Sequence, residues 1–71
     1  MPDPTIPFPA ILAAFTQARR KFMGLSPSAL ARRLGIRTDQ VRAAEDQKRI
    51  GATARAALVR FNRLEAWADA A

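Results

Sequence analysis

The chain has 71 residues, no cysteine, no histidine and a formal net charge of +6. This length suits one small domain, and the lack of cysteine excludes disulfides and thiolate metal sites. The carboxylates show no pairing suited to acid–base catalysis, no residue cluster suits a metal, and no glycine-rich loop suits a nucleotide. We therefore expect no enzyme activity, no metal and no cofactor.

The first eight residues are rich in proline, since four of the five prolines lie in the first nine positions. This start lacks the basic region and apolar run of a signal peptide. Nor does any stretch reach the roughly 18 apolar residues of a transmembrane span. We therefore predict an irregular lead-in over residues 1–8, a cytoplasmic protein and no membrane partner.

Residues 9–71 are predicted to form a single helical domain. Its first helix begins near Pro9 and ends near Gly24, residues that suit a first turn and a position just past a C-terminus. Apolar residues at helical spacing predict the inward face of this helix. They are Ile11, Ala14, Phe15, Ala18, Phe22 and Leu25.

A second helix is predicted between Ser26 and Gly35. Ser26 is a favourable N-cap, Pro27 suits the first turn, and Gly35 ends the helix. A third, short helix opens at Arg37 or Thr38. The residues expected to face inward from these two helices are Leu30, Ala31, Leu34, Val41 and Ala44.

The spacing across these two helices is specific, because small Ala31 precedes Gly35 by four residues and Val41 follows six residues later. A small residue lets two helices approach closely, and glycine adopts the positive φ of a tight turn. The pattern predicts a helix-turn-helix over residues 26–46, whose second helix presents its outer edge to a DNA groove.

The segments Leu25-Ser26 and Leu30 to Ile36, with Val41 and Glu45, resemble the helix-turn-helix of the phage-repressor/Cro (Xre-type) family. The resemblance covers roughly residues 20–49. It implies a compact domain of four or five helices, usually dimeric, that binds operator DNA and regulates transcription. By position it implies that Thr38, Asp39, Arg42 and Ala43 face base edges. It likewise implies that Ser28, Arg37, Lys48 and Arg49 lie at the DNA backbone.

All 12 basic residues lie between positions 19 and 63, a distribution that indicates binding to a polyanion or a solvated arginine surface. Arg32 and Arg33 are either phosphate contacts or solvated charges. Glu45 is expected to be structural and to pair with one of them. In the basic triplet 19–21, one or two residues are expected to face DNA.

Arg42 is the strongest candidate for reading a base, because arginine can make a bidentate contact with guanine. The alternative is that Arg42 pairs with Asp39, three residues earlier on the same helix. Asp39 itself either stabilises the helix N-terminus or accepts a hydrogen bond from a cytosine amino group.

A fourth helix is predicted to run without a break over residues 53–70, with Thr53 as its cap. Its main apolar stripe faces the core. A weaker apolar strip on its other side is expected to form a homodimer interface, unless Trp67 folds back over its own domain. The interface candidates are Val59, Arg63, Trp67 and Ala70.

The sequence therefore predicts an all-α, compact helix-turn-helix domain of about four helices with a long C-terminal helix. We expect a homodimeric transcriptional regulator of the small repressor type, which binds double-stranded DNA sequence-specifically and acts by occupying an operator. RNA polymerase or another regulator is a further expected partner. The alternative is a helical protein-binding module, such as an anti-activator, antitoxin or adaptor, that uses the same shape for protein contacts.

Overall fold

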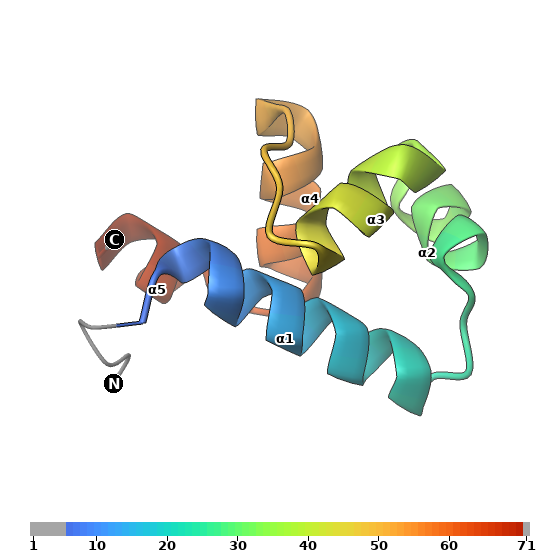
Figure 1. The fold of residues 1–71 in the computed structure, drawn as a ribbon, viewed down its shortest axis with the longest axis horizontal. Helices are drawn as coiled ribbons and strands as arrows, with labels where there is room; N and C mark the ends of the chain where they lie inside the picture. Colours follow the sequence, from blue (N-terminus) through green and yellow to red (C-terminus); the bar gives the residue numbers. More distant parts are fainter. Residues whose placement is uncertain (1–5, 71) are drawn as a thin grey trace.

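The computed structural model describes residues 6–70, with the side chains of residues 6–68 (Figure 1). Five helices make up this part of the chain, which contains no strand, so the predicted all-α class is confirmed. Within it no helix combines the length and apolar character that a membrane crossing requires. The helices are α1 (Phe8–Phe22), α2 (Pro27–Leu34), α3 (Thr38–Glu45), α4 (Ala52–Phe61) and α5 (Glu65–Ala70).

The first helices begin where proline and serine favour it. Residues 1–5 of the predicted lead-in lie outside the described part of the chain. The helix α1 begins at Phe8, the last residue of that lead-in, and Pro9 lies in its first turn. Ser26 caps α2 as predicted, because its Oγ accepts a hydrogen bond from the backbone N–H of Ala29 at 3.1 Å. Proline lacks the backbone N–H that would remain unpaired in a first turn, so it suits these positions.

Each of the helices α1 to α4 is followed, within two residues of its last residue, by a residue with positive φ, between 56° and 71°. At the end of α2, for example, the N–H of Ile36 bonds to the carbonyl of Ala31 at 3.0 Å, and that of Gly35 to Arg32 at 3.3 Å. These bonds satisfy carbonyls that the helix end leaves free, and the following residue turns sharply away. The four positive-φ residues are Gly24, Gly35, Gln47 and Arg63.

The predicted unbroken helix over residues 53–70 is wrong. The chain leaves α4 after Phe61 and begins the short α5 at Glu65, with Arg63 at φ 56° between them. The N–H of Leu64 bonds back to the carbonyl of Val59 at 2.9 Å, and both side chains are buried. Burial of Leu64 thus stabilises a helix end that contains neither glycine nor proline.

The start of α4 also differs from the prediction. Gly51 is the N-cap residue, no side chain caps the helix there, and Thr53 lies inside the first turn. The side chain of Gln40 on α3 instead accepts a hydrogen bond from the N–H of Gly51 at 3.1 Å. This bond ties the connection after α3 back to α3 itself.

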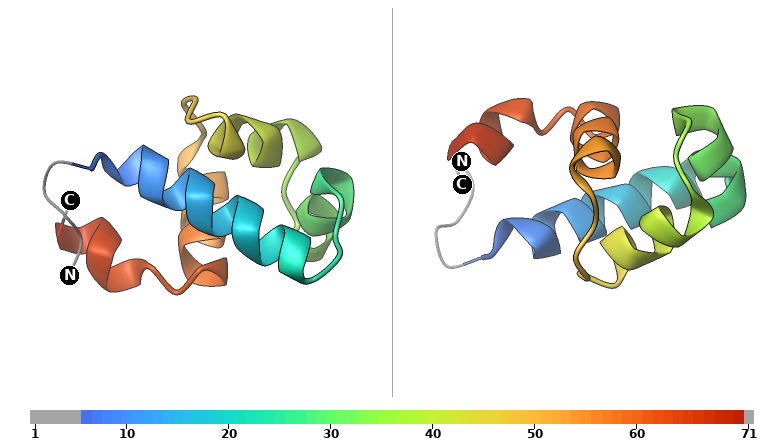
Figure 2. Two further views of the ribbon diagram at one scale, coloured as in Figure 1. Left: turned by 60° about the horizontal axis from the view of Figure 1, so that its bottom comes forward. Right: turned by 90° about the horizontal axis from the view of Figure 1, so that it is seen from above.

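The core lies where α2, α3 and α4 meet the inner face of α1 (Figures 1 and 2). Leu30, Val41 and Leu58, one from each of α2, α3 and α4, have no exposed surface. In Figure 1 and in the left view of Figure 2, α4 crosses α1, and in Figure 2 α5 returns along the first half of α1. The helices α1 and α3 also pack against each other.

The inward face predicted for α1 is largely wrong. Phe22 is 92% exposed and Phe15 is 44% exposed, whereas Leu12 and Thr16 are buried beside the correctly predicted Ile11. Thr16 is fully buried, and its hydroxyl accepts a hydrogen bond from the side-chain amide of Asn62 at 2.8 Å, which offsets the cost of burying a polar group. The real inner face thus includes a polar residue, and the more continuous apolar stripe lies outside.

Candidate nucleic-acid interface

The α2–α3 pair packs closely around the residues that the spacing singled out. Ala31 on α2 is 2% exposed and Val41 on α3 is fully buried. Gly35 adopts φ 70°, and a Cβ at this position would meet no atom within 4 Å. The backbone conformation of the turn, and not a lack of space, is therefore what favours glycine there.

Half of the eight residues of α3 hold the domain together. Val41 and Ala44 are buried, Gln40 binds the backbone of Gly51, and Glu45 forms an ion pair with α1. Of the remaining positions, Asp39 and Arg42 are exposed, whereas Thr38 and Ala43 are half-buried. The outer edge of α3 therefore consists of Thr38, Asp39, Arg42 and Ala43.

The expected pairing of Glu45 with Arg32 or Arg33 is wrong, because Glu45 pairs with Arg20. Nε of Arg20 donates to Oε2 at 2.6 Å, and Nη2 donates to Oε1 at 2.9 Å. The third nitrogen, Nη1, donates to the carbonyl of Leu25 at 2.9 Å. Arg20 therefore joins α1, the turn after it and the end of α3.

This ion pair is shielded from solvent, since each of the two side chains is only 11% exposed. The hydrogen bond to Glu45 raises the pKa of Arg20 above its usual value, and the negative charge of Glu45 adds to this effect. Of the basic residues 19–21, Arg20 therefore stabilises the fold through these contacts. No local pattern predicts this contact, because the partners lie 25 positions apart.

Asp39 pairs with Arg37 and not with Arg42. Nε of Arg37 donates to Oδ1 of Asp39 at 3.1 Å, and the two side chains are 81% and 60% exposed. An ion pair this exposed contributes little to stability. Arg42 makes no ion pair within the described part of the chain, so its guanidinium is available to a ligand.

The residues expected at the DNA backbone are all exposed and lie around α3. Ser28 is in the first turn of α2, where its Oγ lies 3.1 Å from that of Ser26. Arg32 is in the last turn of α2, and Arg37 immediately precedes α3. Lys48 and Arg49 follow α3, so cations lie beyond both of its ends.

The predicted dimer strip does not form a continuous surface. Val59 is only 6% exposed and belongs to the core, because the chain turns after α4 and buries Leu64 beside it. Trp67 folds back as the alternative expected, and its ring lies 6.1 Å from that of Phe15. Arg63 is exposed in the turn. The side chain of Ala70 lies outside the described residues.

Comparison of the chain with protein-family models, with curated proteins and with solved structures finds no match. A functional proposal therefore depends on the placement of the residues alone. That placement brings together an exposed outer edge on α3, an unpaired Arg42 within the described residues, and flanking cations.

Proposed function

We propose that α2 and α3 form a helix-turn-helix and that α3 enters the major groove of double-stranded DNA. The chain then acts as a small, sequence-specific transcriptional regulator that occupies its operator. The observation that carries this proposal is the outer edge of α3, where exposed Arg42 lies between cations at Arg37 and Lys48. Such a distribution suits a helix that meets bases along its middle and phosphates at its ends.

Each side chain at this edge has a defined role in the proposal. Arg42 makes a bidentate contact with guanine, which discriminates against other bases by about 1–3 kcal/mol. Asp39 accepts from a cytosine amino group after it leaves Arg37, an exchange that costs little because their ion pair is exposed. Thr38 and Ala43 contact the neighbouring base edges. The phosphate contacts are Ser28, Arg32, Arg37, Lys48 and Arg49.

A homodimer is part of the same proposal. Two copies related by a two-fold axis would place their α3 helices roughly 34 Å apart on an inverted repeat. Arg63 is the exposed member of the original interface candidates. Sedimentation of the free chain at micromolar concentration should give the dimer mass, and a monomer mass on and off DNA would remove the dimer from the proposal.

The test is a fluorescence-anisotropy titration of labelled duplexes from the chain's own promoter region and of shuffled duplexes, at two salt concentrations. The logarithm of the affinity should fall with that of the salt concentration at about −0.9 per phosphate contacted. Arg42→Ala should reduce the preference for the promoter duplex by about tenfold, and Arg32→Ala should weaken both duplexes alike. Lys21→Ala, the same charge change on α1, is the matched control.

Weak binding that is equal for every duplex and unaffected by Arg42→Ala would contradict the proposal. That outcome would favour the alternative, a helical module that docks on a protein. The two readings differ because only a base-reading side chain changes sequence preference, whereas every exposed cation contributes to non-specific attraction.

A further inference from the structure

The outer side of α1 carries an exposed apolar stripe. Phe22 is 92%, Phe15 44% and Met23 37% exposed, and Ala14 and Ala18 are also exposed. Residues three and four apart lie on the same side of a helix, so Ala14, Phe15, Ala18 and Phe22 are neighbours, and Met23 follows directly at the helix end. Contiguous exposed apolar surface on a small domain marks an interaction site. We call Ala14, Phe15, Ala18, Phe22 and Met23 the α1 face.

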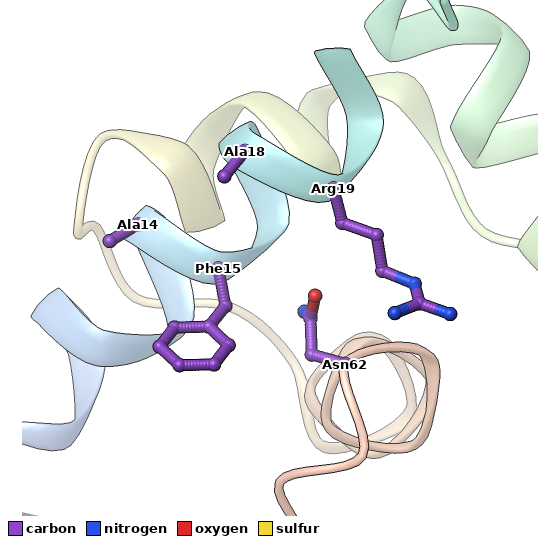
Figure 3. A pocket seen from close by; sticks show the side chains of 5 residues that line it. All are labelled: Ala14, Phe15, Ala18, Arg19 and Asn62. Atoms are coloured by element: carbon purple, nitrogen blue, oxygen red, sulfur yellow. The ribbon is translucent and has the colours of Figure 1, made fainter. Parts of the chain in front are cut away.

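A pocket of about 440 Å³ opens at one end of the α1 face (Figure 3). Ala14, Phe15, Ala18 and Arg19 line it from α1, and Asn62 lines it from the end of α4. In Figure 3 the side chains of Phe15 and Arg19 extend toward α4 on either side of Asn62. The two alanines are small, so space for an apolar side chain remains beside Phe15.

Asn62 is the buried polar residue that lines this pocket. The residue is 6% exposed, and its Nδ2 donates to Thr16 Oγ1 at 2.8 Å and to the Leu58 carbonyl at 3.0 Å. Its Oδ1 is buried and has no hydrogen-bond partner among the described residues. Figure 3 shows this oxygen directed toward the space between Phe15 and Arg19. An unpaired buried acceptor of this kind is energetically unfavourable.

The charges around the α1 face have one sign. The helix carries Arg19, Arg20 and Lys21 and no acidic residue. Arg20 is neutralised by Glu45, whereas Arg19 and Lys21 make no ion pair within the described residues, and Arg19 lies 5.3 Å from the ring centre of Phe61. A second copy of the chain would bring like charges to this face. An acidic partner would be attracted to it.

We propose that the α1 face binds an acidic amphipathic helix of another protein. The apolar side of that helix covers Phe22 and Met23 and places one side chain in the pocket beside Phe15. Its carboxylates lie against Arg19 and Lys21. This is the general mode in which an amphipathic helix lays its apolar side on a complementary surface. None of the residues of the α1 face is among the residues proposed to contact DNA.

Trp67 reports on the pocket, because it is the only tryptophan and its ring lies 6.1 Å from Phe15. The full chain, without DNA, is titrated with a designed helical peptide of about 16 residues that has leucine on one side and glutamate on the other. A second peptide has lysine in place of every glutamate, and both carry a label for anisotropy. The acidic peptide should bind saturably, shift the Trp67 emission and bind more weakly at high salt. The basic peptide should not bind.

Two variants on the face and one beside it complete the experiment. Phe22→Ser removes the most exposed apolar side chain, and Ala18→Glu places an acid at the pocket. Each should weaken binding of the acidic peptide by about tenfold or more. Gln17→Ser, also exposed on α1 but outside the face, should leave binding unchanged. Circular dichroism verifies that all three variants fold.

Three outcomes would overturn the proposal. One is no binding of the acidic peptide by either readout, and another is equal binding of both peptides. The third is a dimer of the free chain that Phe22→Ser dissociates, since the occupant would then be a second copy. Binding that survives Phe22→Ser and Ala18→Glu would place the peptide elsewhere and would count equally against the α1 face.

Discussion

Replacing Arg20 with methionine should destabilise the domain more than any exposed charge substitution. Methionine retains most of the aliphatic length but removes all three hydrogen bonds of the guanidinium. The carboxylate of Glu45, 11% exposed, then remains without its partner. Breaking a buried pair in this way costs about 3–5 kcal/mol. Partial exposure places the expected loss here at about 3 kcal/mol.

That loss is large for a chain of this size. At about 0.05–0.15 kcal/mol per residue, 71 residues correspond to a total stability of roughly 4–11 kcal/mol. Urea unfolding followed by circular dichroism should therefore show a much lower midpoint with an unchanged slope. The melting temperature should fall by more than about 10 °C.

Two further variants separate the ion pair from other effects. Lys21→Met removes the neighbouring cation, which is exposed, and should change stability by less than about 0.5 kcal/mol. The double variant Arg20→Met with Glu45→Leu should regain much of the loss, because no unpaired charge remains buried. If Arg20→Met unfolds at the same urea concentration as Lys21→Met, the reasoning about this ion pair is refuted.

Three other predictions concern helix ends and the buried amide. Gly35→Ala should lower the free energy of unfolding by about 1 kcal/mol because of the positive φ at this position. Gly51→Ser should instead raise it by a few tenths of a kcal/mol, because φ is ordinary there and serine adds a cap. Equal effects of the two substitutions in urea melts would contradict the account of the turn. Ser26→Ala should cost about 1 kcal/mol through its lost bond to α2, and amide exchange in the first turn of α2 should rise with it. Thr16→Val should lower the free energy of unfolding by about 1–3 kcal/mol, because it leaves the buried amide of Asn62 without this partner. The double variant with Asn62→Leu should regain most of that loss, and strictly additive effects of the two substitutions would argue against the bond.

The middle of the fold could be predicted because its signals are local. Ser26 and Gly35 mark the two ends of α2, and both positions act as their residue types suggest. The inward residues Leu30, Ala31 and Val41 are also buried as the periodicity predicts. Each of these signals lies within a few residues of the structure that it determines.

The rest depends on contacts between distant residues. On α1 two adjacent stripes both have helical spacing, and the buried one includes Thr16, whose burial requires Asn62, 46 positions away. The break after α4 occurs at Arg63, a residue type that rarely takes positive φ, and follows from the burial of Leu64. Periodicity alone cannot distinguish between the stripes, and local composition does not reveal this helix end.

The same limits apply to the candidate site. The outer edge of α3 follows from its helical period, so Arg42 could be singled out before the structure. The sequence could not show that Arg42 does not pair with Asp39, because it is Arg37, outside the helix, that binds this carboxylate. The pocket at Asn62 had no sequence signal, since it arises where two helices from opposite ends of the chain meet.

If α3 contacts DNA bases as we propose, the bond between Gln40 and Gly51 limits the number of its side chains that can do so. A glutamine on a reading helix would be well suited to adenine, but here its carbonyl oxygen holds the start of α4. With Val41, Ala44 and Glu45 also committed, one α3 retains four positions, or about as many base pairs at one side chain each. A site that short recurs throughout any genome. A regulator of the proposed kind would recognise a site that is rare in a genome only if several copies bound adjacent half-sites. Its selectivity would then depend more on the number of copies bound to the DNA than on the side chains of one helix.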